Sequence, residues 1–453
     1  MQLLIIGGSD AGISAALRAK ELAPTVQVTM ILADEYPNFS ICGIPFYLSG
    51  EVSDWRNLAH RTEADIKAAG IEVIKNERAI KIDPIEKEVT TINSVSNRNR
   101  YSYDKLIIGT GAKSVRPPIT GLELDGVFTL RWIGEMLRIN EYIQSHGVRS
   151  AVIVGGGYIG LEMADALTLR GVKTTLIEFA PNVLTTVDPP FGDQVEKLLR
   201  GHGISILTNT KVESIERIGT QLRLSGTRNL SKQADLVLVC VGAQPETTLA
   251  MEAGVELGAR SAIKTNRYQG TNIPDVYAAG DCAETWHQLA KQFTYLPLGT
   301  TAHKQGRIAG ENAVRGRRQF QGSLGTQSIK LFDTVIARTG LHDRDAERFG
   351  IQSFTHASTF DDHKAYYPGA TKIHLRLTGE VASGRLLGVQ IMGKVTAEIS
   401  KRIDIAATAI FNELTIEQLS DLDLSYTPPL SSPWDPLQMA AQKAWEAHNA
   451  LKN

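Results

Sequence analysis

The sequence contains few cysteines, almost no net charge and no long apolar run. Its 453 residues include three cysteines, at Cys42, Cys240 and Cys282, which are too few for a disulfide-stabilised secreted scaffold. The 48 lysines and arginines nearly balance the 49 acidic residues, so the net charge of −1 would not attract nucleic acid or an anionic membrane. No apolar run approaches the roughly 20 residues of a membrane span, and no signal-peptide pattern opens the chain. These absences predict a soluble, cytoplasmic protein.

The rest of the composition is that of an ordinary globular protein. Hydrophobic residues make up 42% of the chain and charged residues 21%, which is enough apolar material for several cores. The length is about three times a typical ~150-residue domain and predicts two to four domains. The ten histidines show no metal-ligand spacing, so we expect no metal site.

Two similar units begin with an apolar run that ends in a glycine turn. Residues 3–6 lead into the first turn, a helical pattern follows, and residues 26–32 alternate like a second strand. The same order returns at 151–177. A strand, glycine turn, helix and strand in quick succession form the unit of doubly wound parallel sheets. The chain therefore predicts two dinucleotide-binding domains.

The second turn matches the Gly-x-Gly-x-x-Gly fingerprint, which allows a tight turn and a close approach of the backbone to a pyrophosphate. Glu178 follows the second strand of this unit, at the place where an acid would accept the ribose hydroxyls. No arginine follows Glu178 to hold a 2′-phosphate, so the pattern favours NADH and leaves NADPH as the alternative. A glycine cluster that serves only helix packing is the competing interpretation. The predicted NADH-binding residues are Gly155, Gly157, Tyr158, Ile159, Gly160, Glu178 and Gly242.

The first turn departs from this fingerprint because Ser9 replaces the middle glycine. A serine there requires a negative φ and brings a Cβ near the phosphates. The segment 278–281, much later in the chain, places a carboxylate at a strand end beside a ribityl chain and phosphate, so this domain is predicted to bind FAD. For His303 in this set, a capping or core role is an equal alternative. The predicted FAD-binding residues are Gly7, Ser9, Gly12, Asp34, Glu35, Thr110, Gly111, Gly280, Asp281, Thr301 and His303.

Cys42 is the predicted redox residue. Pro45 indicates that a helix begins just after it, and a thiolate at a helix N-terminus gains from amide donors and the helix dipole, which predicts a lowered pKa. Tyr47 occupies the position where a dithiol enzyme has its second cysteine, so a single-thiol cycle remains. A buried structural cysteine is the alternative. Cys240 is interpreted as core and Cys282 as packing.

The order of these parts resembles the single-cysteine branch of the pyridine nucleotide–disulfide oxidoreductase family. That branch contains coenzyme A disulfide and persulfide reductases, NADH oxidases and NADH peroxidases, and the resemblance is most specific in the segments 39–42, 366–369 and 426–433. It implies an α/β fold of glutathione reductase type, with two doubly wound Rossmann-like domains and a C-terminal α+β dimerisation domain. The expected domains are FAD-binding at 1–113 and 246–322, NAD(P)H-binding at 114–245, and dimerisation at 323–453. In that last domain, alternating patterns predict strands at 329–337, 372–377 and 386–392.

The resemblance also implies roles for individual residues. It implies a homodimer in which each active site is completed by the neighbouring subunit, with Tyr426 and Tyr366 or Tyr367 as the catalytic tyrosines near Cys42. Glu162 resembles the family glutamate near the nicotinamide.

Two departures from the family pattern bear on the substrate. Asp10 stands where the oxidases and peroxidases carry a histidine, and an aspartate lacks the neutral-pH acid–base function of imidazole unless its pKa shifts greatly. Glu21 and Trp434 stand where coenzyme A enzymes place basic residues, and Arg18 is expected to compensate in part.

The predicted function is therefore the NADH-dependent reduction of a small disulfide or persulfide, through a mixed disulfide on Cys42. Three alternatives stay open: an NADH oxidase or peroxidase that uses a Cys42 sulfenic acid, a flavoprotein reductase that donates electrons to a protein partner, and a redox-sensing binding module.

Overall fold

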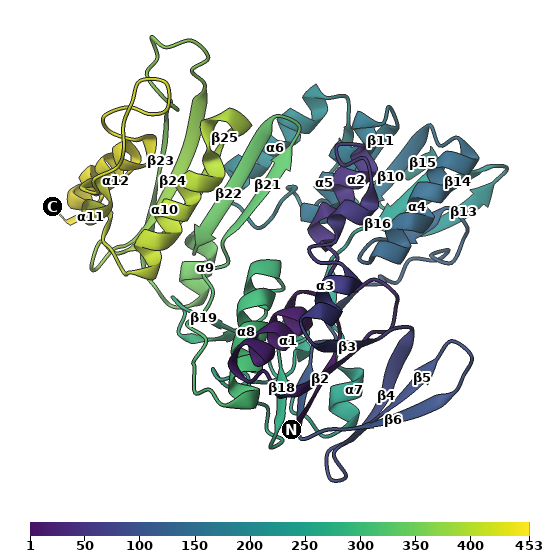
Figure 1. The fold of residues 1–453 in the computed structure, drawn as a ribbon. Helices are drawn as coiled ribbons and strands as arrows, with labels where there is room; N and C mark the ends of the chain where they lie inside the picture. The colour runs from purple at the N-terminus through teal and green to yellow at the C-terminus, as the bar shows by residue number, and fades with distance from the viewer. Residues whose placement is uncertain (453) are drawn as a thin grey trace.

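The computed structural model describes residues 1–452 and forms three domains (Figure 1). Two of the domains are built on parallel sheets and the third on an antiparallel sheet. This confirms the predicted α/β class. Within residues 1–452, no helix has the length and apolarity that crossing a membrane requires.

The first parallel sheet has the strand order β18-β7-β1-β2-β3. Its strands are β1 (Gln2–Ile6), β2 (Gln27–Ile31), β3 (Ile71–Ile74), β7 (Lys105–Ile108) and β18 (Val276–Ala278). Since β18 follows the whole second parallel sheet in the chain and yet pairs with β7 in parallel, the first sheet is assembled from two separate parts of the chain. The residues at which the domains begin and end stay predictions.

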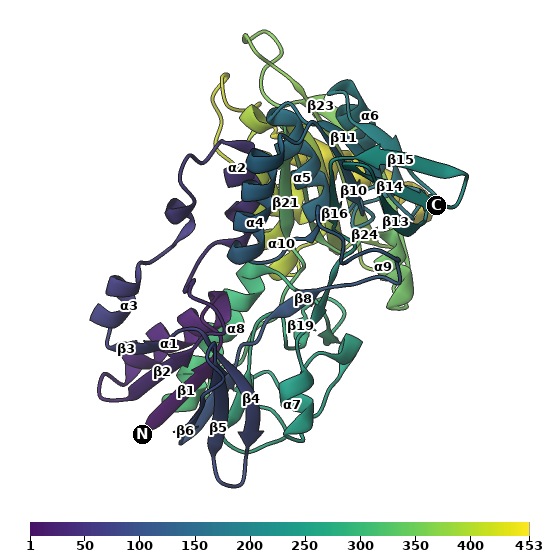
Figure 2. The same ribbon diagram turned by 90° about the vertical axis from the view of Figure 1, so that its right-hand side faces the viewer.

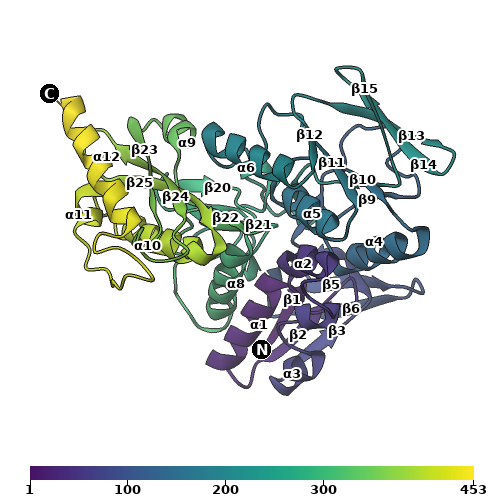
Figure 3. The same cartoon turned by 90° about the horizontal axis from the view of Figure 1, so that it is seen from above.

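Helix α1 (Asp10–Leu22) follows β1 and lies against α8 (Gly299–Val314), as Figure 3 shows from above. Two glycines of α8 make this contact close. A Cβ on Gly306 would overlap the carbonyl oxygen of Ala11, and one on Gly310 would overlap that of Ala15. The backbones of the two helices therefore touch, and this fixes the start of α1, where the first glycine turn lies.

The second parallel sheet has the order β12-β11-β10-β16-β9. Its strands are β9 (Val127–Thr129), β10 (Ser150–Val154), β11 (Lys173–Ile177), β12 (Ser205–Leu207) and β16 (Leu236–Val239). Helix α5 (Tyr158–Leu169) follows the glycine turn after β10. The sheet repeats the arrangement of the first domain, which is what the repeated glycine turn predicts.

Smaller sheets flank the two nucleotide domains. Each of the two three-stranded sheets is an antiparallel meander: β4 (Glu77–Asp83), β5 (Glu88–Asn93) and β6 (Arg98–Ser102), and β13 (Val212–Ile218), β14 (Gln221–Gly226) and β15 (Leu230–Ala234). The short pairs are β8 (Ala112–Ser114) with β17 (Ala243–Pro245) and β19 (Thr285–His287) with β20 (Gln292–Thr294).

The C-terminal domain is a five-stranded antiparallel sheet of order β21-β22-β25-β24-β23. Its strands are β21 (Gln327–Leu331), β22 (Thr334–Gly340), β23 (Ser353–Asp361), β24 (Lys372–Glu380) and β25 (Leu386–Lys394). The single strand predicted at 329–337 is wrong, because two strands and a tight turn occupy this range. Phe332 has a φ of +54° in that turn, a conformation that the alternating apolar pattern does not reveal.

Helices complete the three domains. They are α2 (Ile44–Ser49), α3 (Glu63–Ala68), α4 (Ile133–His146), α6 (Pro189–Gly201), α7 (Thr248–Glu252), α9 (Asp343–Arg348), α10 (Ile399–Phe411), α11 (Ile416–Ser420) and α12 (Pro436–Lys452). One apolar core joins residues of all three domains, including Leu48 of α2, Leu161 of α5 and Ile329 of β21. The site described below lies where these elements meet.

Replacing Gly310 with alanine is expected to destabilise the protein, because the new methyl group forces α1 and α8 apart. Overpacking of this kind costs about 1–3 kcal/mol or more. Urea unfolding followed by circular dichroism measures the effect. Gly201→Ala is the matched control, since Gly201 is also helical but has open space around its Cβ position, and it should stay within about 1 kcal/mol of the parent. Equal stability of Gly310→Ala and the parent would contradict the close helix contact.

Candidate active site

The first glycine turn is closely packed. Gly7 has a φ of +105°, and a Cβ there would overlap the carbonyl oxygen of Gly109, while a Cβ on Gly12 would overlap the carbonyl oxygen of Gly7. Ser9 is the N-cap of α1 with a φ of −88°, and its side chain makes no capping hydrogen bond. The turn therefore leaves the first amides of α1 free to receive an anion, as a pyrophosphate site requires.

Two polar side chains beside this turn have buried atoms without partners. Asn38 is only 1% exposed, its backbone N–H donates to the carbonyl of Gly8 at 2.9 Å, and neither polar atom of its side chain has a hydrogen-bond partner. Arg131 donates from Nη2 to Asp281, but its Nε also lacks a partner. Buried polar groups are nearly always satisfied, so these atoms fit a polar ligand at this turn. FAD, with its hydroxyl and phosphate oxygens, is such a ligand.

The other predicted FAD residues lie in different surroundings. Asp34 follows β2 and accepts a hydrogen bond from the Tyr36 amide at 2.9 Å, while Glu35 is exposed. Thr110 donates to the carbonyl of Glu246 at 2.6 Å, and Thr301 is buried and bonds to Ser323 at 3.2 Å. The hydroxyls of both threonines thus serve contacts within the protein. Gly111 and Gly280 have φ angles of +72° and +83° in their turns.

The second glycine turn has an open centre. Gly155 has a φ of +111° and a Cβ on Gly160 would overlap its carbonyl oxygen, whereas the space beside Gly157 is empty. Glu178 accepts hydrogen bonds from the amides of Gly156 at 2.5 Å and Ala180 at 2.6 Å. The acid is thereby held against the turn, at the place where the ribose of a dinucleotide is expected. The other residues predicted here are Tyr158 and Ile159 in the first turn of α5 and Gly242, which is exposed with a φ of +112°.

Cys42 is exposed and lies directly before α2. Pro45 occupies the first turn of α2, which confirms that a helix begins there. Figure 2 shows the chain leaving the first domain after β2, running to α2 beside α4 and α5, and returning to α3. Arg170 at the end of α5 donates to the carbonyl of Leu48 at 3.3 Å, and Asn140 of α4 donates to the hydroxyl of Tyr47 at 3.2 Å. The second domain therefore anchors the segment that carries the thiol.

The sequence predicts a lowered pKa for Cys42, and this prediction is wrong, because the surrounding protein raises that pKa. Although the Cys42 residue is exposed, the protein packed around it displaces part of the water near its sulfur, and the carboxyls of Glu162, Asp10 and Asp281 add negative charge, so the thiol pKa is raised. Arg131 acts in the opposite direction and is outweighed. Burial, followed by the three nearby carboxyls, therefore acts against the gain that the helix start predicted.

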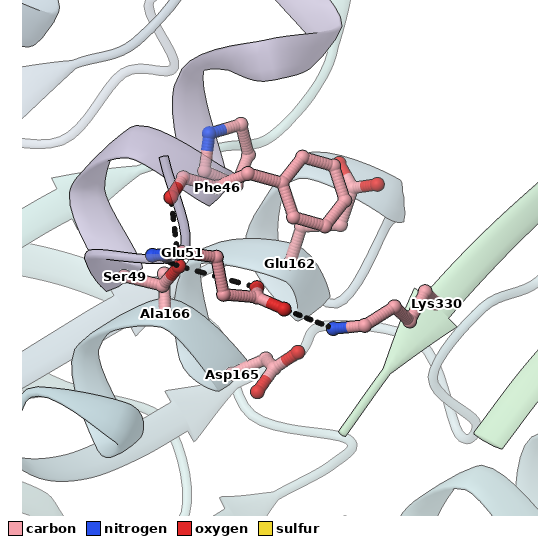
Figure 4. Close-up of a pocket in the computed structure, with 8 residues that line it drawn as sticks. Phe46, Ser49, Glu51, Glu162, Asp165, Ala166 and Lys330 are labelled. Atoms are coloured by element: carbon pink, nitrogen blue, oxygen red, sulfur yellow. Dashed lines mark hydrogen bonds and ion pairs between the residues drawn. The ribbon is translucent and has the colours of Figure 1, made fainter. Parts of the chain in front are cut away.

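A narrow space between α2, α5 and β21 contains a group of carboxyls (Figure 4). Glu51 forms an ion pair with Lys330 at 2.9 Å, and Asp165 accepts the backbone N–H of Phe332 at 3.0 Å. Glu162 points into the same space and makes no ion pair within residues 1–452. Burial and the negative charge of Asp165 raise the pKa of Glu162 to about 7, despite the opposing charge of Lys330. Glu162 therefore changes its charge near neutral pH.

Asp10 has an imidazole beside it. Oδ1 of Asp10 lies 3.4 Å from Nε2 of His303, and the other ring nitrogen of His303 bonds to Ser14 at 2.8 Å. Burial raises the pKa of Asp10, while His303 and His60 oppose the rise. His303 of α8 thus places an imidazole next to Asp10, the position where the related oxidases and peroxidases are expected to carry a histidine.

Neither of the remaining cysteines is exposed: Cys240 is partly buried and Cys282 is buried. Burial raises the pKa of Cys240 to about 12, and Cys282 is fully buried with its sulfur 3.4 Å from the carbonyl oxygens of Ile108 and Ala279. Both positions agree with the packing roles interpreted from the sequence. Among the described residues, no cluster of histidine, cysteine or acidic side chains is suited to hold a metal.

Arg18 does not supply the free cation that was expected of it. Its guanidinium contacts Glu311 at 2.6 Å and Glu21 at 2.8 Å, and Arg307 also faces Glu21 at 3.4 Å. Two carboxylates therefore neutralise Arg18.

The predicted tyrosines lie in two segments of the C-terminal domain, between β23 and β24 and between α11 and α12, and Figure 1 shows these elements at the end of the domain away from α2. All three side chains are exposed: Tyr366, Tyr367 and Tyr426. No described contact within one chain brings them to Cys42. Their predicted role thus requires a second copy of the chain.

The sequence reasoning missed Asn38 and Arg131. Asn38 lies in the segment between β2 and Cys42, where a polar residue surrounded by apolar ones was a usable signal. Arg131 comes just after the strand β9, and Glu135 accepts its backbone N–H at 2.6 Å. Only the fold brings Arg131 to Asp281, which is far away in the sequence.

Two dinucleotide sites with an exposed thiol between them define a flavin- and nicotinamide-dependent oxidoreductase. Residues 1–306 match the model of "Pyridine nucleotide-disulphide oxidoreductase" and residues 326–436 match the dimerisation domain of the same group. The chain belongs to the pyridine nucleotide-disulphide oxidoreductase family. This membership confirms the predicted class of FAD-dependent enzyme that uses a nicotinamide dinucleotide.

Similar proteins extend over the full chain. The NAD(P)H sulfur oxidoreductase (CoA-dependent) of Pyrococcus abyssi is 35% identical and covers 97% of each chain. An NADH oxidase of Methanocaldococcus jannaschii is 30% identical over 98% of each chain. The solved structure of an NAD-dependent persulfide reductase from A. fulgidus has a TM-score of 0.95 and 36% identity, and the match covers 100% of this chain and 84% of that one.

Replacing Glu162 with glutamine is expected to lower the Cys42 pKa. Above about pH 7 the native glutamate is ionised and disfavours the thiolate, so removing its charge moves the midpoint of alkylation to lower pH, by up to about one unit. The rate of iodoacetamide labelling of Cys42, measured by mass spectrometry from pH 6 to 10 on the reduced enzyme, gives this midpoint. Glu216→Gln is the control, because Glu216 is an exposed glutamate of the same domain and is not among the groups that shift the thiol pKa, so its midpoint should match that of the parent. An unchanged or higher midpoint in Glu162→Gln would contradict the predicted electrostatic link.

Proposed function

We propose that this protein reduces a low-molecular-weight disulfide or persulfide with NADH, through a mixed disulfide on Cys42. The observation that carries the proposal is an exposed thiol subject to charges from both nucleotide domains, Asp10 and Asp281 of the first and Glu162 of the second. The similarity to a sulfur oxidoreductase and to a persulfide reductase supports the class of substrate. Because Arg18 is neutralised, we favour a substrate with less negative charge than coenzyme A disulfide.

The first half of the reaction takes place at Cys42. Its thiolate attacks one substrate sulfur, the substrate S–S bond breaks as a bond to Cys42 forms, and the expelled thiolate takes up one proton. When bound, FAD links NADH to this mixed disulfide as a two-electron carrier, and reduction then frees the second thiol and restores Cys42. Overall, one disulfide, one NADH and one proton give two thiols and NAD⁺, and a persulfide gives one thiol and hydrogen sulfide.

We place the proton donor on the neighbouring subunit. Residues 326–436 match a dimerisation domain, which supports a homodimer. Tyr366, Tyr367 and Tyr426 are exposed on this domain, and their hydroxyls suit the transfer of a proton to a departing thiolate. In this arrangement Tyr426 of the partner subunit, with Tyr366 or Tyr367 of the partner subunit, completes the site around Cys42.

We assign the cofactor-binding residues from the two glycine turns and the polar side chains beside them. The first amides of α1, Asp281, Arg131 and Asn38 would hold FAD, and the amides at the start of α5 with Glu178 would hold NADH. Glu162 and Lys330 lie on the α5 side of the thiol, where the nicotinamide is expected. The charges of these two residues set the local electrostatics during the transfer.

Loss of the Cys42 thiol separates sulfur chemistry from flavin reduction. In Cys42→Ser holoenzyme, NADH oxidation that depends on added disulfide should fall at least about 1000-fold, because the nucleophile is gone. Reduction of ferricyanide by NADH should stay within about twofold, because it needs no thiol. Anaerobic steady-state assays with glutathione disulfide, coenzyme A disulfide and coenzyme A persulfide measure both activities. Undiminished disulfide turnover would refute the role of Cys42.

The preference for NADH is expected to depend on Glu178. Its carboxylate would bind the ribose hydroxyls and repel a 2′-phosphate, so Glu178→Gln should lower the ratio of kcat/KM for NADH over NADPH by about tenfold or more. Glu216→Gln, an exposed glutamate of the same domain, is the control and should leave the ratio unchanged. An unchanged ratio in Glu178→Gln would mean that Glu178 only holds the glycine turn.

A second function, the reduction of oxygen or a peroxide, is favoured by the His303–Asp10 contact and by the similarity to an NADH oxidase. Here oxygen would first take two electrons from NADH and two protons to give hydrogen peroxide. The Cys42 thiolate would attack one peroxide oxygen, the O–O bond would break, and the leaving hydroxide would take up a proton to form water. A second NADH, with one proton, would then reduce the sulfenic acid to the thiol and a second water. NADH consumption in air without added disulfide, compared with the anaerobic disulfide rate, decides between the two. A faster rate in air would favour the second function.

A further inference from the structure

Arg402 of α10 is a buried cation at the base of the two tyrosine segments. It is 5% exposed, although it lies in a domain whose tyrosines project into solvent. Burial of a charge is costly unless ion pairs and hydrogen bonds satisfy it completely. Arg402 is therefore expected to have a partner for each of its donor groups.

The guanidinium of Arg402 contacts both segments at once. Its Nη2 donates to the carbonyl oxygen of Asp362, at 2.8 Å, and to that of Leu430, at 3.4 Å. Its Nε donates to the carboxylate of Asp435 at 3.1 Å, and Nη1 donates to the carbonyl of Ala397. Asp362 begins the loop that carries Tyr366 and Tyr367, whereas Leu430 and Asp435 lie in the segment after Tyr426. One side chain thus ties together two parts of the chain that β24, β25 and α10 separate in the sequence.

Asp435, the carboxylate partner of Arg402, also holds the segment after Tyr426 through its own hydrogen bonds. One carboxylate oxygen accepts the Arg402 Nε and the Ser431 hydroxyl, at 3.0 Å, and the other accepts the backbone N–H of Leu437, at 2.9 Å. This carboxylate therefore stands at the start of α12, and it joins the segment after Tyr426 to a helix packed in the core of the domain.

Asp362 closes the first segment into a loop. Its carboxylate accepts the Thr371 amide at 2.7 Å and lies 3.1 Å from Nδ1 of His363, whose ring is in edge contact with Tyr367. Beyond Arg402, the direct hydrogen bond between the two segments runs from the Lys364 amide to the Pro428 carbonyl, at a long 3.4 Å. Tyr366 is 74% exposed, so its own packing does little to hold the loop.

We infer that Arg402 is a positioning residue that sets the Tyr366–Tyr367 loop and the Tyr426 segment in one fixed relation, as a unit offered to the partner's thiol. The catalytic role of the tyrosines in this inference rests on the proposed function. The link between the segments stands on the contacts of Arg402 alone. A lysine cannot replace it, because an ammonium lacks the planar fork that reaches a carboxylate and several carbonyls together.

Arg402→Lys holoenzyme tests the link by hydrogen–deuterium exchange. We expect faster exchange in both 362–371 and 426–435, with the two glycine turns unchanged. Asp435→Asn is the second variant, because it removes the charge and keeps the side-chain volume, and it should loosen the same two segments. Arg338→Lys is the matched control: Arg338 is also a largely buried arginine of this domain, but it donates to the carbonyls of Thr186 and Gly340. It should leave both tyrosine segments unchanged.

Kinetics on the same variants tests the positioning role. A displaced catalytic group costs up to about 100-fold in rate, so kcat for the disulfide should fall about 10- to 100-fold in Arg402→Lys. Reduction of ferricyanide by NADH should stay within about twofold of the parent. In a Tyr426→Phe background, Arg402→Lys should add little further loss, since both changes remove the same contribution.

Three results would overturn the inference: faster exchange in only one segment, faster exchange spread evenly over the chain, or an equal loss of disulfide and ferricyanide activity. If Tyr426→Phe alone has no effect on kcat, the tyrosine role in the proposed function fails. The exchange data would then still decide whether Arg402 links the segments.

Discussion

The packing of α2 against α5 is the contact on which the site depends. A short helix that belongs to the first domain by sequence lies among the helices of the second, with Ile44 and Leu48 in the same core as Leu161. Because Cys42 directly precedes α2, this packing holds the thiol between two nucleotide turns that lie far apart in the sequence. Without this contact, the Cys42 segment would lose its main packing against the second domain.

The charges around the thiol set a second constraint. Glu162, Asp10 and Asp281 surround Cys42 from α5, α1 and the end of β18, and Arg131 is the cation that opposes them. These carboxyls favour the protonated thiol, and the thiolate becomes more favourable when a cofactor, a substrate or a proton transfer changes the charge around the sulfur. Since Glu162 has a pKa of about 7, a proton on this residue favours the thiolate at neutral pH. The protein thus couples the state of the sulfur to a carboxyl in the other nucleotide domain.

The repeated units were predictable because their signals are local. A buried strand, a glycine turn and a helix are neighbours in the sequence, and the structure has them at β1–α1 and β10–α5. The hairpin at Phe332 was not predictable, because its apolar alternation continues through the turn and the positive φ leaves no mark in the pattern.

The Cys42 pKa was predicted wrongly for another reason. The helix start beside the thiol is local, but the carboxyls that outweigh it belong to α1, to α5 and to the turn after β18, none of which adjoins Cys42 in the sequence. Arg131 and the neutralisation of Arg18 by Glu311 also depend on contacts between distant segments. Contacts of this kind appear only once the chain has folded.

The most direct test of the account is mass spectrometry of the Cys42 peptide after holoenzyme with oxidised flavin and a reduced Cys42 thiol is mixed with a small disulfide. The account predicts one half of the disulfide attached to Cys42, at one adduct per chain, and release of the adduct when NADH is added without any other reductant. An adduct on Cys240 or Cys282, or a Cys42 adduct that NADH leaves in place, would contradict it.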